Sequence, residues 1–132
     1  MKRRDFLLTA LAASAMPLSA SAREFVEYAP GVIEAALQDG KTVLVDYAAK
    51  WCSTCKRQAR VINALREGDP AYDAAMIFVK VDWDLYKSHD VTLGRGVPRR
   101  STLILLRGEE ELGRLVAATG EDEIKDLLNR GL

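Results

Sequence analysis

Apolar and polar positions along the chain fall into blocks that predict strands separated by helices. Three near-continuous apolar runs are typical of strands covered on both faces: Thr42–Ala48, 76–81 and 102–106. Between them, residues 52–65 carry apolar side chains at helical spacing, and residues 85–91 form a shorter and weaker helical pattern. This alternation predicts an α/β fold.

The two ends of this pattern complete the expected order of elements. Residues 25–28 predict a short edge strand, and residues 30–38 predict a helix. After the third apolar run, Gly108 opens a turn, residues 112–118 predict a hairpin partner, and Glu121–Asn129 predicts a closing helix with acidic residues in its first turn. The order implies a central mixed sheet with helices on both faces.

Composition limits what such a domain can be. The chain has 132 residues, enough for one domain, with 19 basic and 19 acidic side chains and a net charge of zero. That balance gives no reason to expect a nucleic-acid partner. Two cysteines and one histidine are too few for a disulfide scaffold, and they cannot fill a four-ligand zinc site from Cys and His alone. We therefore expect no metal site and no organic cofactor.

The first 22 residues have the pattern of an export signal. A basic start is followed by an apolar stretch over residues 6–18 and then by the small residues Ala20, Ser21 and Ala22. The apolar stretch is shorter than the ~20 residues that a membrane-spanning helix needs. We expect residues 1–22 to be removed near Ala22, which leaves a domain over residues 23–132 with no stable membrane insertion.

Two adjacent arginines suggest the export route. Arg3-Arg4-Asp5-Phe6-Leu7 resembles the twin-arginine signal, although Lys2 and Leu8 depart from its usual pattern, and the general secretory route is the alternative. Either route predicts a periplasmic location, where disulfides form. The leader holds three of the 19 basic and one of the 19 acidic residues, so residues 23–132 have a net charge of −2. We expect no strong electrostatic preference in partners.

Cys52 and Cys55 form the one strong chemical motif, at the point where a buried strand gives way to a helix. A thiol at a helix N-terminus meets unpaired backbone N–H groups and the positive end of the helix dipole, and both stabilise its thiolate. The i, i+3 spacing places the two sulfurs on one helical face. We expect Cys52 to be the exposed, attacking thiol and Cys55 to be the buried thiol that resolves a mixed disulfide.

A Cys-x-x-Cys pair also has uses other than redox chemistry. Zinc lacks a second pair of ligands, and so local a disulfide would close too small a loop to stabilise the fold much. A copper(I) carrier that uses both thiolates is the alternative of a different class, although no Met or His cluster accompanies the motif. A redox-inert binding module is a third possibility, which the intact cysteine pair opposes.

Residues 43–56, with the letters VLVDYAAKWCSTCK, resemble the strand, active site and helix of the thioredoxin family. The family implies a three-layer fold and residue roles. Asp46 matches a buried aspartate whose pKa is raised by desolvation and which takes the proton of Cys55 through water, with a solvent-exposed carboxylate at the strand end as the alternative. Lys80 matches the lysine that pairs with that aspartate, with a surface lysine as the alternative. Trp51 matches the tryptophan beside the active site, with plain core packing as the alternative.

The sequence departs from the family opposite the cysteines, where members usually carry a cis-proline directly before a Thr-apolar strand. Here Ser101 precedes Thr102, and Pro98 lies three residues earlier. Two registers remain: Pro98 fills the proline position and is followed by an insertion, or Ser101 fills it. The second fits the strand better, and it would place Arg100 near the sulfurs, where its charge favours a thiolate.

The resemblance implies a monomeric thiol–disulfide oxidoreductase that uses the cysteine pair in place of a cofactor. Its context is similar to that of the soluble C-terminal domain of the membrane electron carrier that feeds disulfide isomerases. The expected substrates are disulfide-bearing exported proteins. Because the compartment is oxidising, a reducing role needs a membrane thiol donor.

Overall fold

A computed structural model describes residues 24–132. Five strands form one sheet in the order β1-β3-β2-β4-β5. Strand β2 (Thr42–Ala48) lies at the centre, parallel to β3 (Met76–Asp82) and antiparallel to β4 (Thr102–Arg107). The short strand β1 (Val26–Glu27) pairs parallel with β3 at one edge, and β5 (Glu110–Val116) pairs antiparallel with β4 at the other. The predicted mixed sheet is confirmed.

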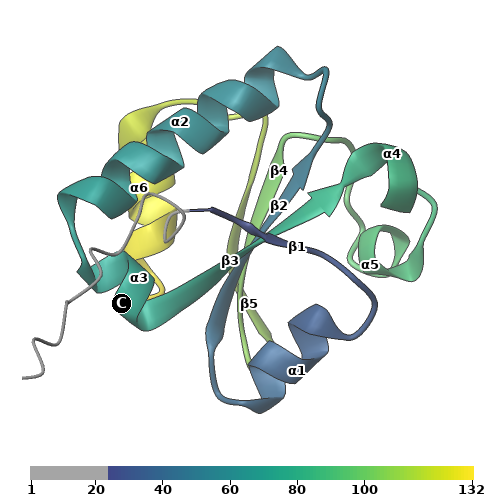
Figure 1. The fold of residues 1–132 in the computed structure, drawn as a ribbon, viewed down its shortest axis with the longest axis horizontal. Helices are drawn as coiled ribbons and strands as arrows, with labels where there is room; N and C mark the ends of the chain where they lie inside the picture. The colour runs from purple at the N-terminus through teal and green to yellow at the C-terminus, as the bar shows by residue number, and fades with distance from the viewer. Residues whose placement is uncertain (1–23) are drawn as a thin grey trace, which may run out of the picture.

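Helices cover both faces of this sheet, as Figure 1 shows. One face packs against α1 (Val32–Gln38), α4 (Trp83–Tyr86) and α5 (Asp90–Leu93). The other packs against α2 (Ser53–Gly68), α3 (Ala71–Ala75) and α6 (Glu121–Asn129). Two separate apolar clusters result, one on each side of β2, whose seven residues are all buried. The continuous apolar run of β2 follows from this double burial.

Helix α3 was not predicted from the sequence, in which the segment Gly68-Asp69-Pro70 indicated a loop. The chain turns there and begins a helix again, because Asp69 Oδ1 accepts a hydrogen bond from the Ala71 backbone N–H at 2.9 Å. Pro70, with φ −66°, already has the backbone conformation of a helix start. Helix α2 also runs to Gly68, three residues beyond its expected end.

The weak helical pattern over residues 85–91 proves to be two separate short helices, α4 and α5. Asp82 Oδ1 accepts from the backbone N–H groups of Asp84 and Leu85 and so caps α4. His89 Nδ1 accepts from the Val91 backbone N–H and caps α5. Two caps seven residues apart start two helices, which is why the prediction of one helix was wrong.

Among the described residues, no helix combines the length and the apolar character needed to cross a bilayer. The predicted signal over residues 1–22 lies outside the described residues, and so does the start of the predicted domain at Arg23. The export prediction therefore stays a prediction.

Candidate active site

Cys52 and Cys55 sit where β2 leads into α2, and they are joined by a disulfide with a Cα–Cα distance of 5.3 Å. Cys52 is the N-cap residue of α2, in an extended backbone conformation with φ −88° and ψ 111°. Its Sγ accepts a hydrogen bond from the Cys55 backbone N–H at 3.2 Å. An unpaired helix-start N–H thus points at the sulfur of Cys52, as the motif predicts.

Both cysteines are buried, with 3% of Cys52 and 2% of Cys55 exposed. The prediction of an exposed Cys52 is therefore wrong for the disulfide form. The N-cap conformation turns Sγ back toward the first turn of the helix, where the two cysteines pack with Ala48 and Ala49. A hydroxyl group from another loop covers the remaining side.

That hydroxyl belongs to Ser101. Its Oγ lies 3.3 Å from Cys52 Sγ and 3.1 Å from Cys55 Sγ, and the whole residue is buried. Pro98, by contrast, is exposed, and the described residues contain no cis peptide bond. The residue that faces the sulfurs is therefore Ser101, in the second of the two registers weighed from the sequence.

Ser101 has a left-handed backbone with φ +65°, which is uncommon for a residue other than glycine. Hydrogen bonds hold it from two sides: its N–H donates to the Tyr47 carbonyl at 2.7 Å, and its carbonyl accepts from the Ala117 N–H at 2.8 Å. The same carbonyl accepts from Gln58 Nε2 at 3.0 Å. Such an outlier persists only where its surroundings determine it, and here they do.

Gln58 is a residue of the site that sequence reasoning missed. It is fully buried on α2, and its Nε2 also donates to the Ala118 carbonyl at 2.9 Å. One side chain thereby joins the loop before β4 to the segment after β5. A signal was present: Gln58 follows Cys55 at i+3, which places a polar amide on the apolar face of the helix.

Asp46 lies behind the disulfide at the centre of β2 and is 1% exposed. Neither carboxyl oxygen has a hydrogen-bond partner among the described residues. Burial raises the pKa of this carboxyl to about 7, against a smaller lowering by the positive charge of Lys80. A carboxyl with a pKa near neutrality can both take up and release a proton at physiological pH.

Lys80 is the cross-strand neighbour of Asp46 on β3. Its ammonium group makes its ion pair with Glu27 at the edge of the sheet, with 3.4 Å between Nζ and Oε1. The predicted pairing with Asp46 is therefore wrong as a salt bridge, because the Lys80 side chain is bound to the carboxylate on β1. What remains is an attraction at longer range, which lowers the pKa of Asp46 without cancelling the effect of burial.

A cavity of about 260 Å3 is lined by both this carboxyl and Cys55. Lys56, Asn63 and Lys80 also line it. Its volume suffices for several waters, since one water occupies about 30 Å3 of liquid. The Oδ1 atom of Asn63 also lacks a protein partner here. The cavity offers a path by which a proton can pass between Cys55 and Asp46 through water.

Trp51 precedes the motif and is 59% exposed, so the alternative of plain core packing is wrong. Its indole N–H donates to the Asp84 carboxylate at 3.1 Å. The guanidinium of Arg100 lies over the indole ring, 4.5 Å from its centroid. Arg100 is thus in the expected loop beside the motif, where it makes a cation–π contact with Trp51.

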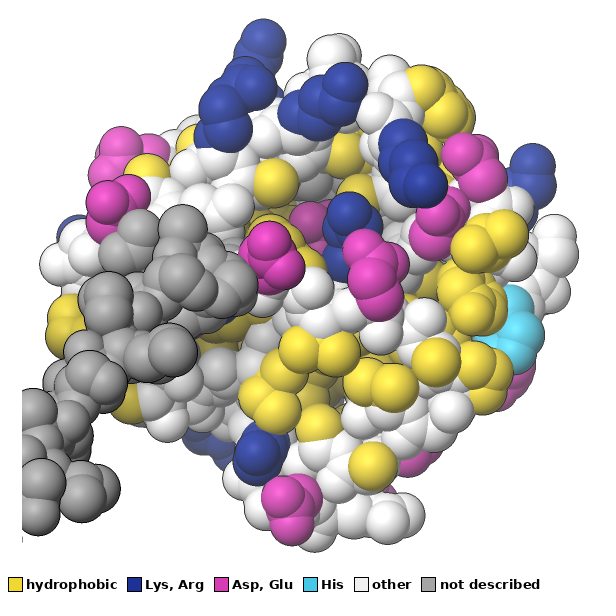
Figure 2. Space-filling view, in the orientation of Figure 1, with side chains coloured by type: hydrophobic (Ala, Val, Ile, Leu, Met, Phe, Trp, Pro, Cys, Tyr) yellow, Lys and Arg dark blue, Asp and Glu magenta, His cyan; other side chains and the backbone are white. Residues whose placement is uncertain are grey.

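Basic side chains gather beside the motif. Lys50 precedes it, and the exposed face of α2 carries Lys56, Arg57 and Arg60. Figure 2 shows Lys and Arg side chains along the edge of the molecule over α2. Positive charge here adds to the helix dipole, and both favour an anionic sulfur at the start of α2.

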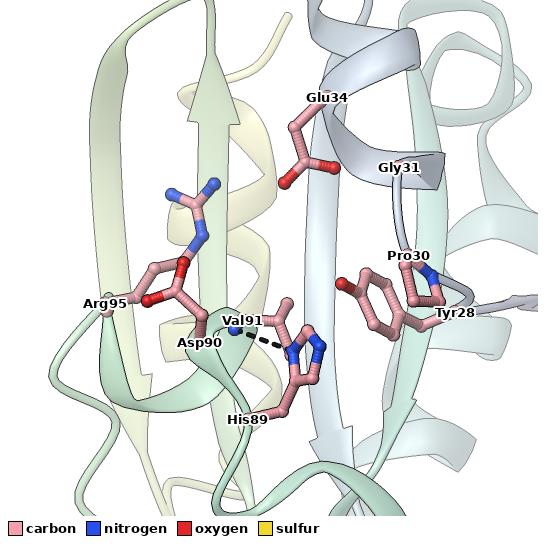
Figure 3. Close-up of a pocket in the computed structure, with 9 residues that line it drawn as sticks. Tyr28, Pro30, Gly31, Glu34, His89, Asp90, Val91 and Arg95 are labelled. Carbon is pink, nitrogen blue, oxygen red and sulfur yellow. Dashed lines mark hydrogen bonds between the residues drawn. The ribbon is translucent and has the colours of Figure 1, made fainter.

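A second and larger cavity, of about 450 Å3, lies away from the sulfurs on the opposite face of the sheet. Figure 3 shows His89, Asp90 and Arg95 from the α5 region facing Glu34 and Tyr28 across it. His89 is exposed and caps α5. Among residues 24–132, no group of three or more His, Cys, Asp or Glu side chains is arranged to hold a metal ion.

Comparison with known proteins identifies the family of this chain. The thioredoxin family matches residues 26–130. The chain belongs to the thioredoxin family. A thioredoxin of Buchnera aphidicola is 30% identical over 106 residues, which covers 79% of this chain and 92% of the relative. A thioredoxin of Echinococcus granulosus is 32% identical over 73% of this chain and 83% of the relative.

Solved structures agree with this assignment. A crystal structure of Trxlp from Edwardsiella tarda has a TM-score of 0.69 and 34% identity, and covers 78% of this chain and 97% of that one. The reduced thioredoxin pre-protein of Schistosoma mansoni has a TM-score of 0.66 and 27% identity, with 83% and 99% covered. The chain is therefore a thioredoxin-type disulfide oxidoreductase with Cys52 and Cys55 as its cysteine pair, and proteins of this family act on protein disulfides.

Proposed function

We propose that this thioredoxin works outside the cytoplasm, in the periplasm, where it reduces disulfides in other exported proteins. The leader pattern over residues 1–22 supports the location, since a basic start, an apolar stretch and Ala20-Ser21-Ala22 occur in the order of an export signal. The proposed chemistry is supported by the hydrogen bond from the Cys55 backbone N–H to the Cys52 sulfur, because this bond stabilises negative charge on Cys52 Sγ and not on Cys55 Sγ.

The two sulfurs of the pair act in successive steps of the reaction. The Cys52 thiolate attacks one sulfur of the substrate disulfide, and the other substrate sulfur leaves as a thiolate that takes a proton from solvent. Cys55 then loses its proton and attacks Cys52 Sγ, which breaks the mixed disulfide. The second substrate sulfur leaves as a thiolate and takes up a proton, which balances the one that Cys55 lost. Two electrons pass to the substrate, and the protein is left with the Cys52–Cys55 disulfide that the structure contains.

Asp46 is the group that takes the proton of Cys55. Both line the same cavity, so one or a few waters can bridge them. A carboxyl with a pKa of about 7 is well matched to this task, since it is partly ionised at neutral pH and can release the proton afterwards. Its lack of other hydrogen-bond partners leaves both oxygens available.

Continued turnover needs a source of electrons. The periplasm holds no thiol buffer that would reduce the disulfide again, so the reductant is a thiol pair on a membrane carrier. The protein acts as a monomer that meets its donor and its substrates in turn. The basic edge beside the motif and the exposed indole of Trp51 are the surfaces that meet these partners.

Covalent trapping tests this function. Cys55→Ala removes the resolving sulfur, so mixed disulfides on Cys52 should persist and can be recovered from the periplasmic fraction after rapid acid quenching. The double variant Cys52→Ala/Cys55→Ala is the matched control, and it should trap nothing. Recovery of exported disulfide proteins from the single variant alone is the expected result. Equal recovery from both variants, or none from either, would contradict the proposal.

A further inference from the structure

Ser101 contacts both reacting sulfurs, although the family's usual residue at this place carries no side-chain donor. Its Oγ is 3.3 Å from Cys52 Sγ and 3.1 Å from Cys55 Sγ. In the disulfide form neither sulfur bears a hydrogen, so the hydroxyl is the donor in these contacts. A hydroxyl has one hydrogen and two acceptor lone pairs, and it can therefore donate to one sulfur and accept from the other.

We propose that Ser101 is a further catalytic residue, whose hydroxyl bridges the two thiols of the reduced protein: it donates to the Cys52 thiolate and accepts from the Cys55 thiol. The inference rests on the thiol–disulfide exchange proposed above. It adds that this chain stabilises its attacking sulfur with a side-chain donor as well as with the helix N-terminus. A hydrogen bond to a charged acceptor is stronger than one to a neutral acceptor, so the hydroxyl favours the ionised sulfur.

The backbone around Ser101 supports this role. The positive φ of +65° is a strained conformation for serine, and it is held by the bonds to Tyr47, Ala117 and Gln58. Antiparallel pairing ends at Tyr47 and Thr102, so Ser101 is the first residue past the ladder. These restraints fix the position of the hydroxyl before the thiolate forms. A donor that is already in place need not reorganise when charge appears.

Charged groups also lie near the sulfurs, but the contacts from the Ser101 hydroxyl are separate from them. Asp46, Lys80 and Asp82 line the cavity behind Cys55 from the sheet. Lys50, just before the motif, and Lys56 on α2 line it from the other side. On the other side, Arg100 stacks on Trp51, which in turn holds Asp84 of α4. All of these groups act on the cysteines in any variant of Ser101. A substitution that removes only Oγ therefore isolates the hydroxyl.

The test compares the acidity of Cys52 in matched variants of the full chain. Ser101→Ala keeps the Cβ atom and its backbone strain and removes Oγ alone, while Ser101→Gly relieves the strain and also lacks the hydroxyl. Reduced proteins are alkylated with iodoacetamide over a pH series, and mass spectrometry assigns the product to Cys52 or Cys55. We expect both variants to raise the pKa of Cys52 by at least one unit, a tenfold loss of acidity.

The control variant is Ser88→Ala, which removes an exposed hydroxyl outside the motif and should leave the pKa of Cys52 unchanged. A second readout is the equilibrium with glutathione above that pKa. There, a tenfold loss of thiolate stabilisation lowers the reduction potential of the Ser101 variants by about 30 mV. The glycine variant keeps the test valid if the alanine variant does not fold.

Two results would overturn the inference. One is an unchanged pKa of Cys52 in both Ser101 variants while the wild-type pair cycles normally, which leaves the proposed function intact. The other is a shift in Ser101→Ala alone, with Ser101→Gly matching the wild type, which would assign the effect to backbone strain. A wild-type pair that cannot cycle between thiols and disulfide would instead contradict the proposed function itself.

Discussion

Asp46 and Cys55 line the same cavity, so the one fully buried carboxyl group among residues 24–132 lies beside the same space as the inner sulfur of the disulfide. The carboxyl comes from the centre of the sheet and the sulfur from the first turn of α2. A group buried without hydrogen-bond partners costs stability when it ionises. The ionisation of Asp46 is thus linked to the stability of the fold, and so is the proton transfer proposed for this carboxyl.

This link predicts a pH dependence of stability. The pKa of Asp46 is about 7 in the folded protein and 3.8 without the fold, so between these values the folded state binds more protons than the unfolded state. The free energy of unfolding should therefore fall as pH rises from about 4 to about 7, by up to about 1.4 kcal/mol per pH unit from this group, and level off above.

Urea denaturation of the disulfide form at pH 5, 6, 7 and 8 measures this effect. Asp46→Asn should remove this contribution to the slope and be more stable than the wild type at pH 8, because no charge is then buried. Asp122→Asn, at an exposed position in α6, is the control and should keep the wild-type slope. Parallel pH profiles for the wild type and Asp46→Asn would show that the carboxyl does not titrate as described.

A second prediction concerns kinetics. In Asp46→Asn, the attack of Cys52 on a disulfide should proceed at nearly the wild-type rate, whereas the release of the mixed disulfide by Cys55 should slow on the order of 10²-fold at pH 7, as is typical for the loss of a general base. Acid quenching at successive times, followed by mass spectrometry, resolves the two steps. A mixed disulfide that decays as fast as in the wild type would rule out a role for Asp46.

Local sequence signals predicted the elements that depend on few long-range contacts. Strand Thr42–Ala48 and helix Glu121–Asn129 have the predicted bounds, because a near-continuous apolar run and an acidic first turn mark them directly. The position of Cys52 at the start of a helix was also predictable from the motif. Helix α3 was not, since it depends on one hydrogen bond from the Ala71 backbone N–H to the Asp69 carboxylate, which resembles that of an ordinary turn.

The partners of the cysteines were harder to predict, because they depend on strand register. Ser101 faces the sulfurs since β4 pairs with β2 up to Thr102 and Tyr47, which places the preceding residue beside the end of β2. The sequence alone left open whether Pro98 or Ser101 faces the sulfurs, and the pairing of β4 with β2 decides for Ser101. The burial of Cys52 and the competing ion pair of Lys80 with Glu27 likewise come from segments distant in the sequence.

Arg100 and Trp51 supply a third prediction. Arg100→Ala should free the indole, which already has 59% of its surface exposed, and should increase acrylamide quenching of Trp51 fluorescence. Because Trp83 also fluoresces, both proteins carry Trp83→Phe. The loss of a cation–π contact at an exposed site should cost about 0.5–1 kcal/mol of stability. Unchanged quenching would mean that the stack does not form in solution.

Packing between β5 and α6 gives a fourth prediction. A Cβ atom on Gly113 would come within 2.8 Å of Leu127 Cδ1 and 2.6 Å of Arg130 Nη1. The contact with Arg130 costs little, because it is the end of a flexible and exposed side chain, whereas Leu127 is buried. Gly113→Ala should therefore lower the free energy of unfolding by about 1 kcal/mol, the low end of the cost of overpacking. Gly68→Ala is the matched control: its Cβ would meet nothing within 4 Å, and alanine favours the helix. Equal stabilities in urea for the two variants would contradict this packing.

Export supplies the last prediction. Lysine preserves the positive charge of the leader, which is enough for the general secretory route, but the twin-arginine route requires the arginines themselves. Arg3→Lys/Arg4→Lys should therefore leave an unprocessed precursor in the cytoplasm, while the wild type appears in the periplasm with an N-terminus near Arg23. Cell fractionation and mass spectrometry of the N-terminus measure both. Normal processing of the variant would assign export to the general route, and a wild type that stays unprocessed in the cytoplasm would contradict export itself.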